Sequence, residues 1–363
     1  MMNASKLALD KNRRMIVISD IHGNLQLLQK LLDKIAYTPE DYLFINGDMC
    51  EKGADSLGVI DFLTSLTAQL ERVYVTKGNC DILINYVFNE VEGIKNYMKK
   101  QPNSILNEML KKQDKSLADF HSLKDLSKFY RTHYKNEIDW LEALPIAYET
   151  EHFIIIHAGI EDIPNWQSTT IENALSMPAF YEKGHRADKT VIVGHWPVVN
   201  YTTQSICSNN PLIDLDKRII AIDGGNQIKR EGQLNALVVD GEQISFTFVD
   251  ELQEMAMIQQ SHQDTTARVG TVTYPNYELE IIKEEPFFTH CKNIELGITQ
   301  WVKNEFITRN NNQLISNNDI STTFLSVQQG EIIKVINNDC SGYTLIKNDN
   351  GEIGWIPKQC LYS

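Results

Sequence analysis

The sequence lacks long apolar runs and an excess of positive charge. No stretch of its 363 residues approaches the about 18 consecutive apolar residues that span a bilayer. Residues 1–20 lack an apolar segment followed by a small-residue cleavage site, so we expect a cytoplasmic protein. The net charge of -14 works against non-specific attraction to nucleic acid or to an anionic membrane. The expected partners are therefore small substrates and proteins.

Paired cysteines and an excess of proline or glycine are also missing. The six cysteines, at positions 50, 80, 207, 291, 340 and 360, include no C-x-x-C pair, so we expect reduced thiols rather than a disulfide framework. With 10 prolines and 19 glycines, the chain is neither collagen-like nor wholly disordered. Its length indicates a globular protein of about two domains.

Three strand and loop units follow one another near the start of the chain. Short β-branched or aromatic runs at 15–19, 42–45 and 73–76 each end in a polar loop, and apolar residues at helical spacing follow the first two loops. Successive units of this kind predict an α/β protein with a mainly parallel sheet. Ligand sites in such sheets lie just beyond the carboxyl ends of the strands.

The remainder of the first domain, which we place at 1–250, alternates helical and extended patterns. Residues 82–145 have no strand-like run and predict a helical insertion that ends before Pro145. Strands are expected again at 153–156, 191–193 and 219–222. The runs 234–239 and 244–249, separated by an Asp-Gly turn, predict a β-hairpin.

The C-terminal part has a different composition. Residues 251–284 are polar and are expected to form a linker, and short alternating runs at 324–327, 331–336 and 342–346 predict a small all-β unit over 285–363. This segment resembles an SH3-like barrel, which implies a peptide partner bound at an aromatic groove; Trp355, Pro357 and Tyr362 are the candidates. The alternatives are that Trp355 packs inside the barrel, or that the barrel docks on its own catalytic domain or mediates dimerisation.

Metal-ligand residue types recur at the ends of successive predicted strands. A single histidine there is more often structural, but repeated His, Asp and Asn at the same end are difficult to explain by packing. Oxygen and imidazole donors together suit Mn²⁺, Fe or Zn²⁺. We expect two divalent ions that are bridged by Asp48, with Mn²⁺ as the preferred candidate. Glycines beside the ligands allow close backbone approach. The candidate ligands are Asp20, His22, Asp48, Asn79, His157 and His195.

The ordered motifs resemble those of the calcineurin-like metallophosphoesterase superfamily over roughly residues 14–250. The insertion and the phrases WLEALPIAYETEHFIIIHAGI and VIVGHWPV resemble its bacterial phosphoprotein phosphatase branch, which includes protein phosphatases and symmetrical dinucleoside tetraphosphatases. The resemblance implies a β-sandwich flanked by helices. It places Asp20, His22 and Asp48 on one ion and Asp48, Asn79, His157 and His195 on the other. The motifs are Asp20-Ile-His22-Gly-Asn24, Gly47-Asp48, Gly78-Asn79, His157-Ala-Gly159 and Gly194-His195.

Two motifs depart from the family pattern. Gly78-Asn79-Cys80-Asp81 replaces a Gly-Asn-His-Glu whose histidine protonates the leaving alcohol, so Cys80 either supplies that proton or fills space. Glu51 takes the place of the acid that orients this histidine. Lys52 replaces a phosphate-binding arginine and loses its bidentate fork. Both charges could equally be solvated loop residues.

Three functions are compatible with these residues. The resemblance implies a protein Ser/Thr phosphatase-like phosphomonoesterase acting on a phosphorylated protein or a small phosphoester, with Lys52, Asn24 and Asn79 near the phosphate. Gly-Asn-Cys-Asp favours a phosphodiesterase or a dinucleoside polyphosphate hydrolase. The missing histidine and arginine would also suit a degenerate domain that only binds phosphorylated partners. Asp223 ends a strand near this site and either shapes its rim or forms a turn.

Overall fold

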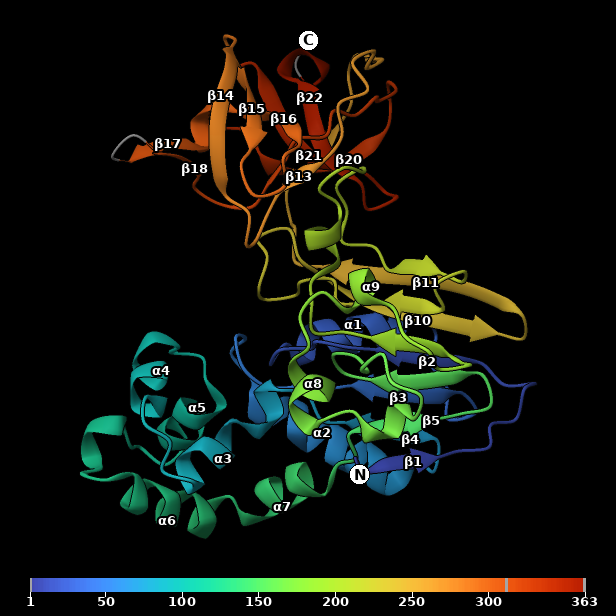
Figure 1. Ribbon diagram of the computed structural model, residues 1–363, viewed down its shortest axis with the longest axis vertical. Helices are drawn as coiled ribbons and strands as arrows, with labels where there is room; N and C mark the ends of the chain where they lie inside the picture. Colours follow the sequence, from blue (N-terminus) through green and yellow to red (C-terminus); the bar gives the residue numbers. More distant parts are fainter. Residues whose placement is uncertain (1, 311–312, 362–363) are drawn as a thin grey trace. The chain divides into compact units, whose positions relative to one another are not determined.

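The computed structural model describes residues 2–310 and 313–361, and the chain divides into two compact units (Figure 1). Unit 1 comprises Met1–Trp196 and Pro211–Asp250. Unit 2 comprises Pro197–Asn210 and Glu251–Ser363. The candidate ligands all belong to unit 1.

The first sheet of unit 1 has the strand order β11-β10-β2-β3-β4. Strands β2 (Met15–Ile18), β3 (Tyr42–Asn46) and β4 (Val73–Thr76) are parallel, as the repeated crossovers predict. Helices α1 (Leu25–Lys34) and α2 (Ser56–Gln69) connect them. The predicted hairpin is β10 (Gln233–Asp240) and β11 (Gln243–Asp250), and β10 runs antiparallel to β2.

The second sheet of unit 1 has the order β1-β5-β6-β7-β9-β8. Strands β6 (Phe153–Ile156), β7 (Thr190–Val193) and β9 (Ile219–Ala221) are parallel and form its centre. Strands β5 (Ala147–Glu149) and β8 (Leu212–Asp214) pair antiparallel to this group on either side, and β1 (Ala4–Lys6) adds to β5.

Strands β2 and β3 carry apolar side chains on both faces, so one face packs against the second sheet and the other packs against helices. Val17 and Phe44 form one buried cluster with Ile155 and Ile192 of the second sheet. Residues on the opposite face of β2, such as Ile16, belong to a cluster with α1 and α2. Burial on both faces explains the continuous apolar runs of these strands. The predicted α/β class is confirmed, with two packed sheets and helices on an outer face.

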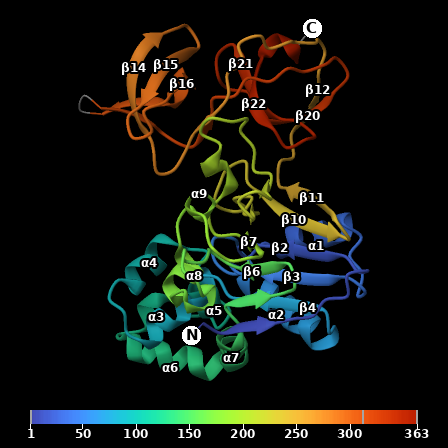
Figure 2. The same ribbon diagram turned by 45° about the vertical axis from the view of Figure 1, so that its right-hand side comes forward.

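Helices occupy the predicted insertion. Figures 1 and 2 show α3 to α6 gathered beside the sheets of unit 1. Leu106, Met109 and Leu126 belong to the same buried cluster as the α2 residue Leu63, so the insertion packs onto unit 1. Two short helices, α8 (Ile171–Ser176) and α9 (Phe180–Lys183), lie between β6 and β7 in the chain. The insertion helices are α3 (Leu83–Phe88), α4 (Ile94–Lys100), α5 (Ile105–Lys111), α6 (Leu123–His133) and α7 (Lys135–Ala143).

Unit 2 is built from β-strands. One antiparallel sheet has the order β16-β15-β14-β18-β17, another has the order β12-β20-β21-β22, and β13 pairs with β19. The strands are β12 (Met255–Met257), β13 (Thr271–Val272), β14 (Glu278–Glu284), β15 (Phe288–Asn293), β16 (Thr299–Lys303), β17 (Ile307–Asn310), β18 (Gln313–Ser316), β19 (Ile320–Ser321), β20 (Ile332–Asn337), β21 (Tyr343–Lys347) and β22 (Ile353–Pro357).

These strands differ from the SH3-like barrel expected over 285–363. Within the described part of unit 2 the sheets remain open and no barrel closes, so the SH3-like assignment is not confirmed. The run 324–327 forms only isolated bridges, and residues 251–284, expected as a linker, carry β12, β13 and β14. Trp355 is fully buried and donates its indole N–H to the Ser321 carbonyl, so it packs inside the unit rather than lining a groove. Tyr362 lies outside the described residues.

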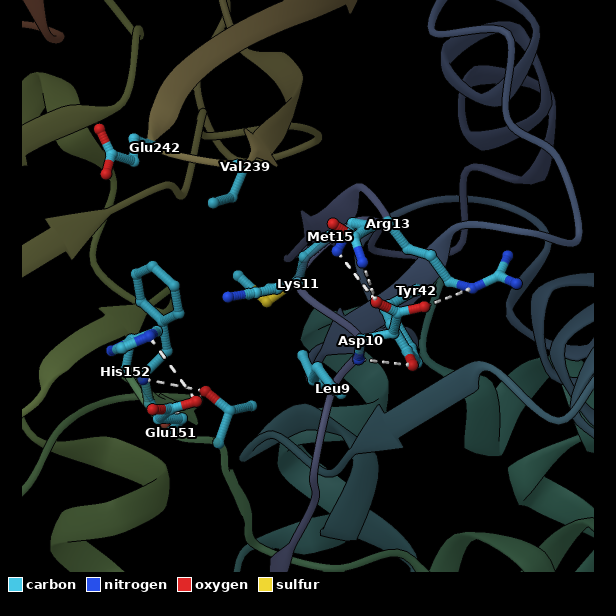
Figure 3. A pocket seen from close by; sticks show the side chains of 14 residues that line it. Leu9, Asp10, Lys11, Arg13, Met15, Tyr42, Glu151, His152, Val239 and Glu242 are labelled. Atoms are coloured by element: carbon cyan, nitrogen blue, oxygen red, sulfur yellow. Dashed lines mark hydrogen bonds and ion pairs between the residues drawn. The ribbon is translucent and has the colours of Figure 1, made fainter.

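Two further features concern the surface of the chain. Across residues 2–310 and 313–361, every helix is too short or too polar to cross a bilayer. A hollow of about 330 Å³ opens in unit 1 between the starts of β2, β3 and β6 and the β10–β11 turn (Figure 3). Its lining includes Met15, Tyr42 and Phe153, the first residues of their strands. It therefore lies at the strand ends opposite to the candidate ligands.

Candidate metal centre

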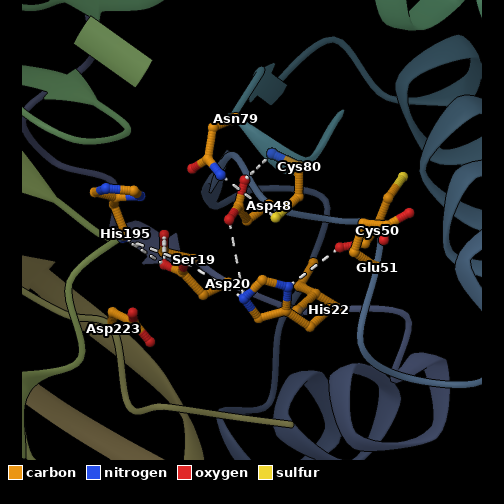
Figure 4. A network of polar contacts seen from close by, with 12 residues as sticks. Ser19, Asp20, His22, Asp48, Cys50, Glu51, Asn79, Cys80, His195 and Asp223 are labelled. Atoms are coloured by element: carbon orange, nitrogen blue, oxygen red, sulfur yellow. Dashed lines mark hydrogen bonds and ion pairs between the residues drawn. The ribbon is translucent and has the colours of Figure 1, made fainter. Parts of the chain in front are cut away.

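The predicted ligands lie in loops that follow five strands of unit 1. Asp20 and His22 follow β2, Asp48 follows β3, Asn79 follows β4, His157 follows β6 and His195 follows β7. Because the carboxyl ends of parallel strands meet at one edge of a sheet, these loops converge. Figure 4 shows side chains from both sheets pointing into one buried cluster around Asp48.

Asp48 lies between two groups of donor atoms. His22, Asp48 and Cys80 form one group, and Asp48, His157 and His195 form another; within each group the donor atoms lie within 4.8 Å of one another. His157 Nε2 lies 3.3 Å from Asp48 Oδ1 and 3.1 Å from Asn79 Oδ1. His22 Nε2 lies 3.8 Å from Asp20 Oδ1 and 3.9 Å from Asp48 Oδ2. A carboxylate shared by two groups is placed to bridge two ions.

Backbone carbonyls orient two of the imidazoles. His22 Nδ1 lies 3.1 Å from the Cys50 carbonyl oxygen, and His157 Nδ1 lies 3.0 Å from the Asn46 carbonyl oxygen. Because Nδ1–H donates in each case, Nε2 is the nitrogen that faces the carboxylates and would be left to bind a metal ion. Among the described residues, His22 Nε2 is buried without a hydrogen-bond partner. A cation at this position would satisfy it, so the donor set fits metal ions.

The charges of the cluster also favour cations. Burial raises the pKa of Asp20, and the neighbouring charge of Asp223 raises it further. Burial opposes a charge on His157, yet the Asp48 carboxylate outweighs it and raises the pKa of the imidazole to about 10. Burial and the charge of His157 lower the pKa of His195 to about 4. Buried carboxylates facing one another bind positive charge strongly, which two divalent ions would supply.

The ligand loops hold unusual backbone conformations. Asp20, His22, Asp48 and His195 have φ values of 57°, 49°, 48° and 66°, in the left-handed region that non-glycine residues rarely adopt. A Cβ on Gly78 would lie 2.1 Å from Asp48 Oδ1, so only glycine fits there. Such strained positions persist where the surrounding structure enforces them, and they concentrate at functional sites.

Cys80 lies beside the bridging carboxylate. Its backbone N–H donates to Asp48 Oδ1 at 2.8 Å, and its sulfur belongs to the donor group of His22 and Asp48. Burial first, and then the charge of Asp48, raise the pKa of the thiol well above its usual range.

Glu51 connects the metal-binding loop to the helical insertion. Its carboxylate accepts hydrogen bonds from Tyr97 Oη at 2.6 Å, Ser104 Oγ at 2.9 Å and the Ile105 N–H at 2.7 Å. Among the described residues it makes no hydrogen bond to Cys80, the residue that the resemblance implies it should orient. Lys52 Nζ lies 5.8 Å from the centre of the Tyr97 ring, so this lysine borders the insertion.

Two other predicted residues have local contacts. Asn24, expected near the phosphate, is the N-cap of α1, and its Oδ1 accepts the Leu27 N–H at 3.1 Å. Asn79 is held between His157 and Cys80, since its Nδ2 lies 3.6 Å from the Cys80 sulfur. Asn79 thus lies within the cluster, whereas Asn24 stabilises the helix that follows it.

Sequence reasoning missed residues that support the ligands. Ser19 hydrogen-bonds to Asp20 Oδ2, and Asn46 Nδ2 donates to the Ile156 carbonyl while the Asn46 carbonyl holds His157. Asp81 accepts the N–H groups of Gly78, Met49 and Cys50. A polar residue at the end of a fully buried strand, such as Asn46, was a signal that could have been used.

The family is shown by comparison with known proteins. The calcineurin-like phosphoesterase family matches residues 13–237, and the chain belongs to this family. It is therefore a hydrolase of phosphoric esters, and the family uses a dinuclear divalent metal centre. The alternative of a domain that only binds phosphorylated partners is set aside.

Individual relatives are more distant. A symmetrical bis(5'-nucleosyl)-tetraphosphatase of Actinobacillus pleuropneumoniae serotype 3 is 25% identical over 232 residues, which cover 59% of this chain and 76% of that protein. The protein of that name from Proteus mirabilis is 29% identical over 157 residues, 42% of this chain and 46% of its own length. A solved protein serine/threonine phosphatase from Saccharomyces cerevisiae is 11% identical, with a TM-score of 0.43 over 70% of this chain and 85% of that chain.

Proposed function

We propose that the chain is a two-metal hydrolase of phosphoanhydrides, acting on dinucleoside polyphosphates. The observation that carries the proposal is Cys80, which lies beside Asp48 where the family's protein phosphatases place a proton-donating histidine. Hydrolysis of a seryl or threonyl phosphate expels an alkoxide, which needs a proton donor. A nucleoside phosphate is a far better leaving group and needs that proton much less. The names of the curated relatives support the same substrate class.

The chemistry requires little more than the cluster itself. Two dications bound in this cluster would polarise a phosphoryl group and would lower the pKa of a coordinated water. Asp20, Asp48, Asn79 and the imidazoles would hold the ions, and Lys52 at the border of the insertion would bind a phosphate oxygen as a point charge. We propose Mn²⁺ as the ion because the donors mix oxygen and imidazole nitrogen.

A second candidate is the protein Ser/Thr phosphatase-like phosphomonoesterase. The helical insertion and the motif-level resemblance to phosphoprotein phosphatases favour it, and its substrate would be a phosphorylated protein. In that case the Cys80 thiol would have to protonate the leaving alkoxide. The two candidates therefore differ in the demand that they place on one side chain.

The deciding experiment compares substrates on chelator-stripped protein reloaded with Mn²⁺. Diadenosine tetraphosphate, para-nitrophenyl phosphate, its bis ester and a phosphoserine peptide would be assayed together, with Asp48→Asn as the blank. The proposal predicts the highest kcat/KM for diadenosine tetraphosphate. A preference for the phosphoserine peptide would establish the second candidate, and a preference for the bis ester would indicate a phosphodiesterase.

The replacement Cys80→His tests the reason for this preference. Restoring an imidazole should raise the rate on alkyl phosphates more than the rate on diadenosine tetraphosphate, because only the alkoxide needs the proton. Cys80→Ser is the matched control, since it keeps the size of the side chain without providing an imidazole. An unchanged ratio of the two rates in Cys80→His would contradict the argument from the leaving group.

A further inference from the structure

Asp223 is a fully buried carboxylate that the ligand set does not include. It follows β9 at the same edge of the second sheet as His157 and His195, and its exposed fraction is 0%. Its Oδ1 accepts the Gly225 N–H at 2.7 Å, which closes a turn. Its Oδ2 is buried and, among the described residues, has no hydrogen-bond partner. One oxygen therefore serves the turn, and the other is unused.

The Asp223 carboxylate lies beside the metal centre. Figure 4 shows the Asp223 side chain pointing toward Asp20 and His22. Burial, and then the nearby charge of Asp223, raise the pKa of Asp20. The turn is fixed against the same loop, because Asn226 Nδ2 donates to the Ile21 carbonyl at 2.7 Å. The carboxylate is thus held in place opposite Asp20.

This arrangement is unfavourable unless something binds there. A buried carboxylate oxygen without a donor loses its hydration, and a second carboxylate beside it adds repulsion. The Asp20 and Asp48 carboxylates both lie within 4 Å of His22 Nε2. Among the described residues, the Asp223 carboxylate has no such contact with a histidine nitrogen. Asp223 Oδ2 therefore lacks the donor that a buried carboxylate oxygen needs, and a water molecule would supply one.

We propose that Asp223 is a positioning residue for the ion on the Asp20 and His22 side of the centre. Its Oδ2 accepts a hydrogen bond from a water molecule next to this ion, and its charge strengthens binding of the ion. Groups of this kind around a metal typically change its affinity by about 10- to 100-fold. The inference concerns metal binding and does not depend on which phosphoric ester is the substrate.

The test is a titration of chelator-stripped protein with Mn²⁺, followed by calorimetry and by the electron paramagnetic resonance signal of the coupled pair. In Asp223→Asn one of the two sites should weaken by about 10- to 100-fold, and the coupled signal should require correspondingly more Mn²⁺. Asp223→Glu, which keeps the charge, should recover part of the affinity. Asn still offers a carbonyl oxygen to the Gly225 N–H, so a role limited to the turn predicts no change in Asp223→Asn.

Glu108→Gln is the matched control for loss of a half-buried carboxylate. Glu108 accepts the N–H groups of Ser56 and Leu57 at 2.8 and 3.1 Å, so it serves the start of α2. Its Mn²⁺ affinities should equal those of the wild type. Unchanged Mn²⁺ binding in Asp223→Asn, or equal weakening in Glu108→Gln, would overturn the proposal. If Asp223→Asn fails to fold, Asp223→Ser replaces it, because a serine hydroxyl can also accept the Gly225 N–H in such a turn. Unchanged Mn²⁺ affinities in Asp223→Ser would then overturn the proposal.

Discussion

Two sets of buried carboxylates lie close together in unit 1, and they are stabilised in different ways. The loop carboxylates, Glu51 and Asp81, each accept three hydrogen bonds from neighbouring groups. The centre carboxylates, Asp20, Asp48 and Asp223, face one another, and Asp223 Oδ2 lacks a partner in the described structure. Burial is common to both sets. Hydrogen bonds are common to both sets as well, since Asp20 accepts the His195 N–H and Asp48 the Cys80 N–H. The repulsion among the centre carboxylates and the unpaired Asp223 oxygen are what distinguish the set that needs a cation.

The largest expected effect is that of Asp48→Asn. Because Asp48 belongs to both donor groups, losing its charge should impair both ions and reduce turnover by about 10³-fold or more, equivalent to roughly 4 kcal/mol. Asparagine tolerates the left-handed backbone at position 48, so the fold should be kept. Phosphoesterase assays and circular dichroism would check both expectations. Residual activity above a tenth of the wild type would contradict the bridging role.

The corresponding test of the loop carboxylates is Glu51→Ala. Removing the acceptor leaves Tyr97, Ser104 and Ile105 with unsatisfied donors, and the free energy of unfolding should fall by about 3 kcal/mol. Glu51→Gln keeps an acceptor and should lose less than about 1 kcal/mol. Denaturant unfolding without metal would measure both. If Glu51→Ala is as stable as Glu51→Gln, the comparison between the two sets fails.

Bound metal should increase the stability of the fold through the centre carboxylates and not through the loop carboxylates. Saturation with Mn²⁺ at about 100 times Kd would stabilise the fold by about 2.7 kcal/mol per site if the unfolded chain does not bind the ion. For a unit of this size that corresponds to a rise in Tm of about 5–10 °C, which differential scanning fluorimetry would detect. The increment should disappear in Asp48→Asn and persist in Glu51→Gln. A full increment in Asp48→Asn would place the ions elsewhere.

The smallest expected effect concerns a carboxylate outside both sets. Burial opposes ionisation of Asp41, but hydrogen bonds from Arg14 at 2.9 and 2.7 Å and from the Thr38 N–H outweigh it and lower the pKa of Asp41. A lowered pKa contributes stability above the unfolded-state pKa of about 3.9 and loses it as pH falls through the folded-state pKa. Asp41→Asn should therefore be less stable than the wild type at pH 7 by about 0.5–1 kcal/mol.

Unfolding measured from about pH 7 down to pH 3 would check this dependence, because the difference between the two proteins should shrink toward the acidic end. A difference that stays constant with pH would mean that Arg14 does not act on Asp41 through its charge. Arg14→Gln is the control, since it removes the same pair from the other side.

The sequence predicted the parts of unit 1 that depend on local patterns. Apolar runs followed by polar loops located β2, β3 and β6, and parallel topology then brought Asp20, Asp48 and His157 to one edge. Spacing could not reveal which oxygen or nitrogen remains unpaired. The free Nε2 of His22 depends on a carbonyl in another loop, that of Cys50.

The differences between expectation and structure also have a physical reason. Alternating runs predicted strands in unit 2, but the way strands close depends on pairing between distant segments, and β14 starts at Glu278, within the expected linker. Trp355 was a candidate for a surface groove because aromatic residues occur both in cores and in binding sites. Its indole N–H donates a hydrogen bond to the buried Ser321 carbonyl, so Trp355 belongs to the core of unit 2. The motif assigned Glu51 to orienting the residue at position 80. Its hydrogen-bond partners instead lie in the helical insertion, whose contacts no motif describes.

The Glu51 contacts also affect how the protein opens in solution. The Ile105 N–H at the start of α5 donates to Glu51, and the backbone N–H of Glu51 itself donates to Ser56 Oγ at the start of α2. Amide protons on both sides of this carboxylate should therefore exchange with solvent in one cooperative opening rather than independently. The lifetime of the ordered metal-binding loop would then be set by how often the first turn of α5 opens, a rate that hydrogen exchange can measure residue by residue.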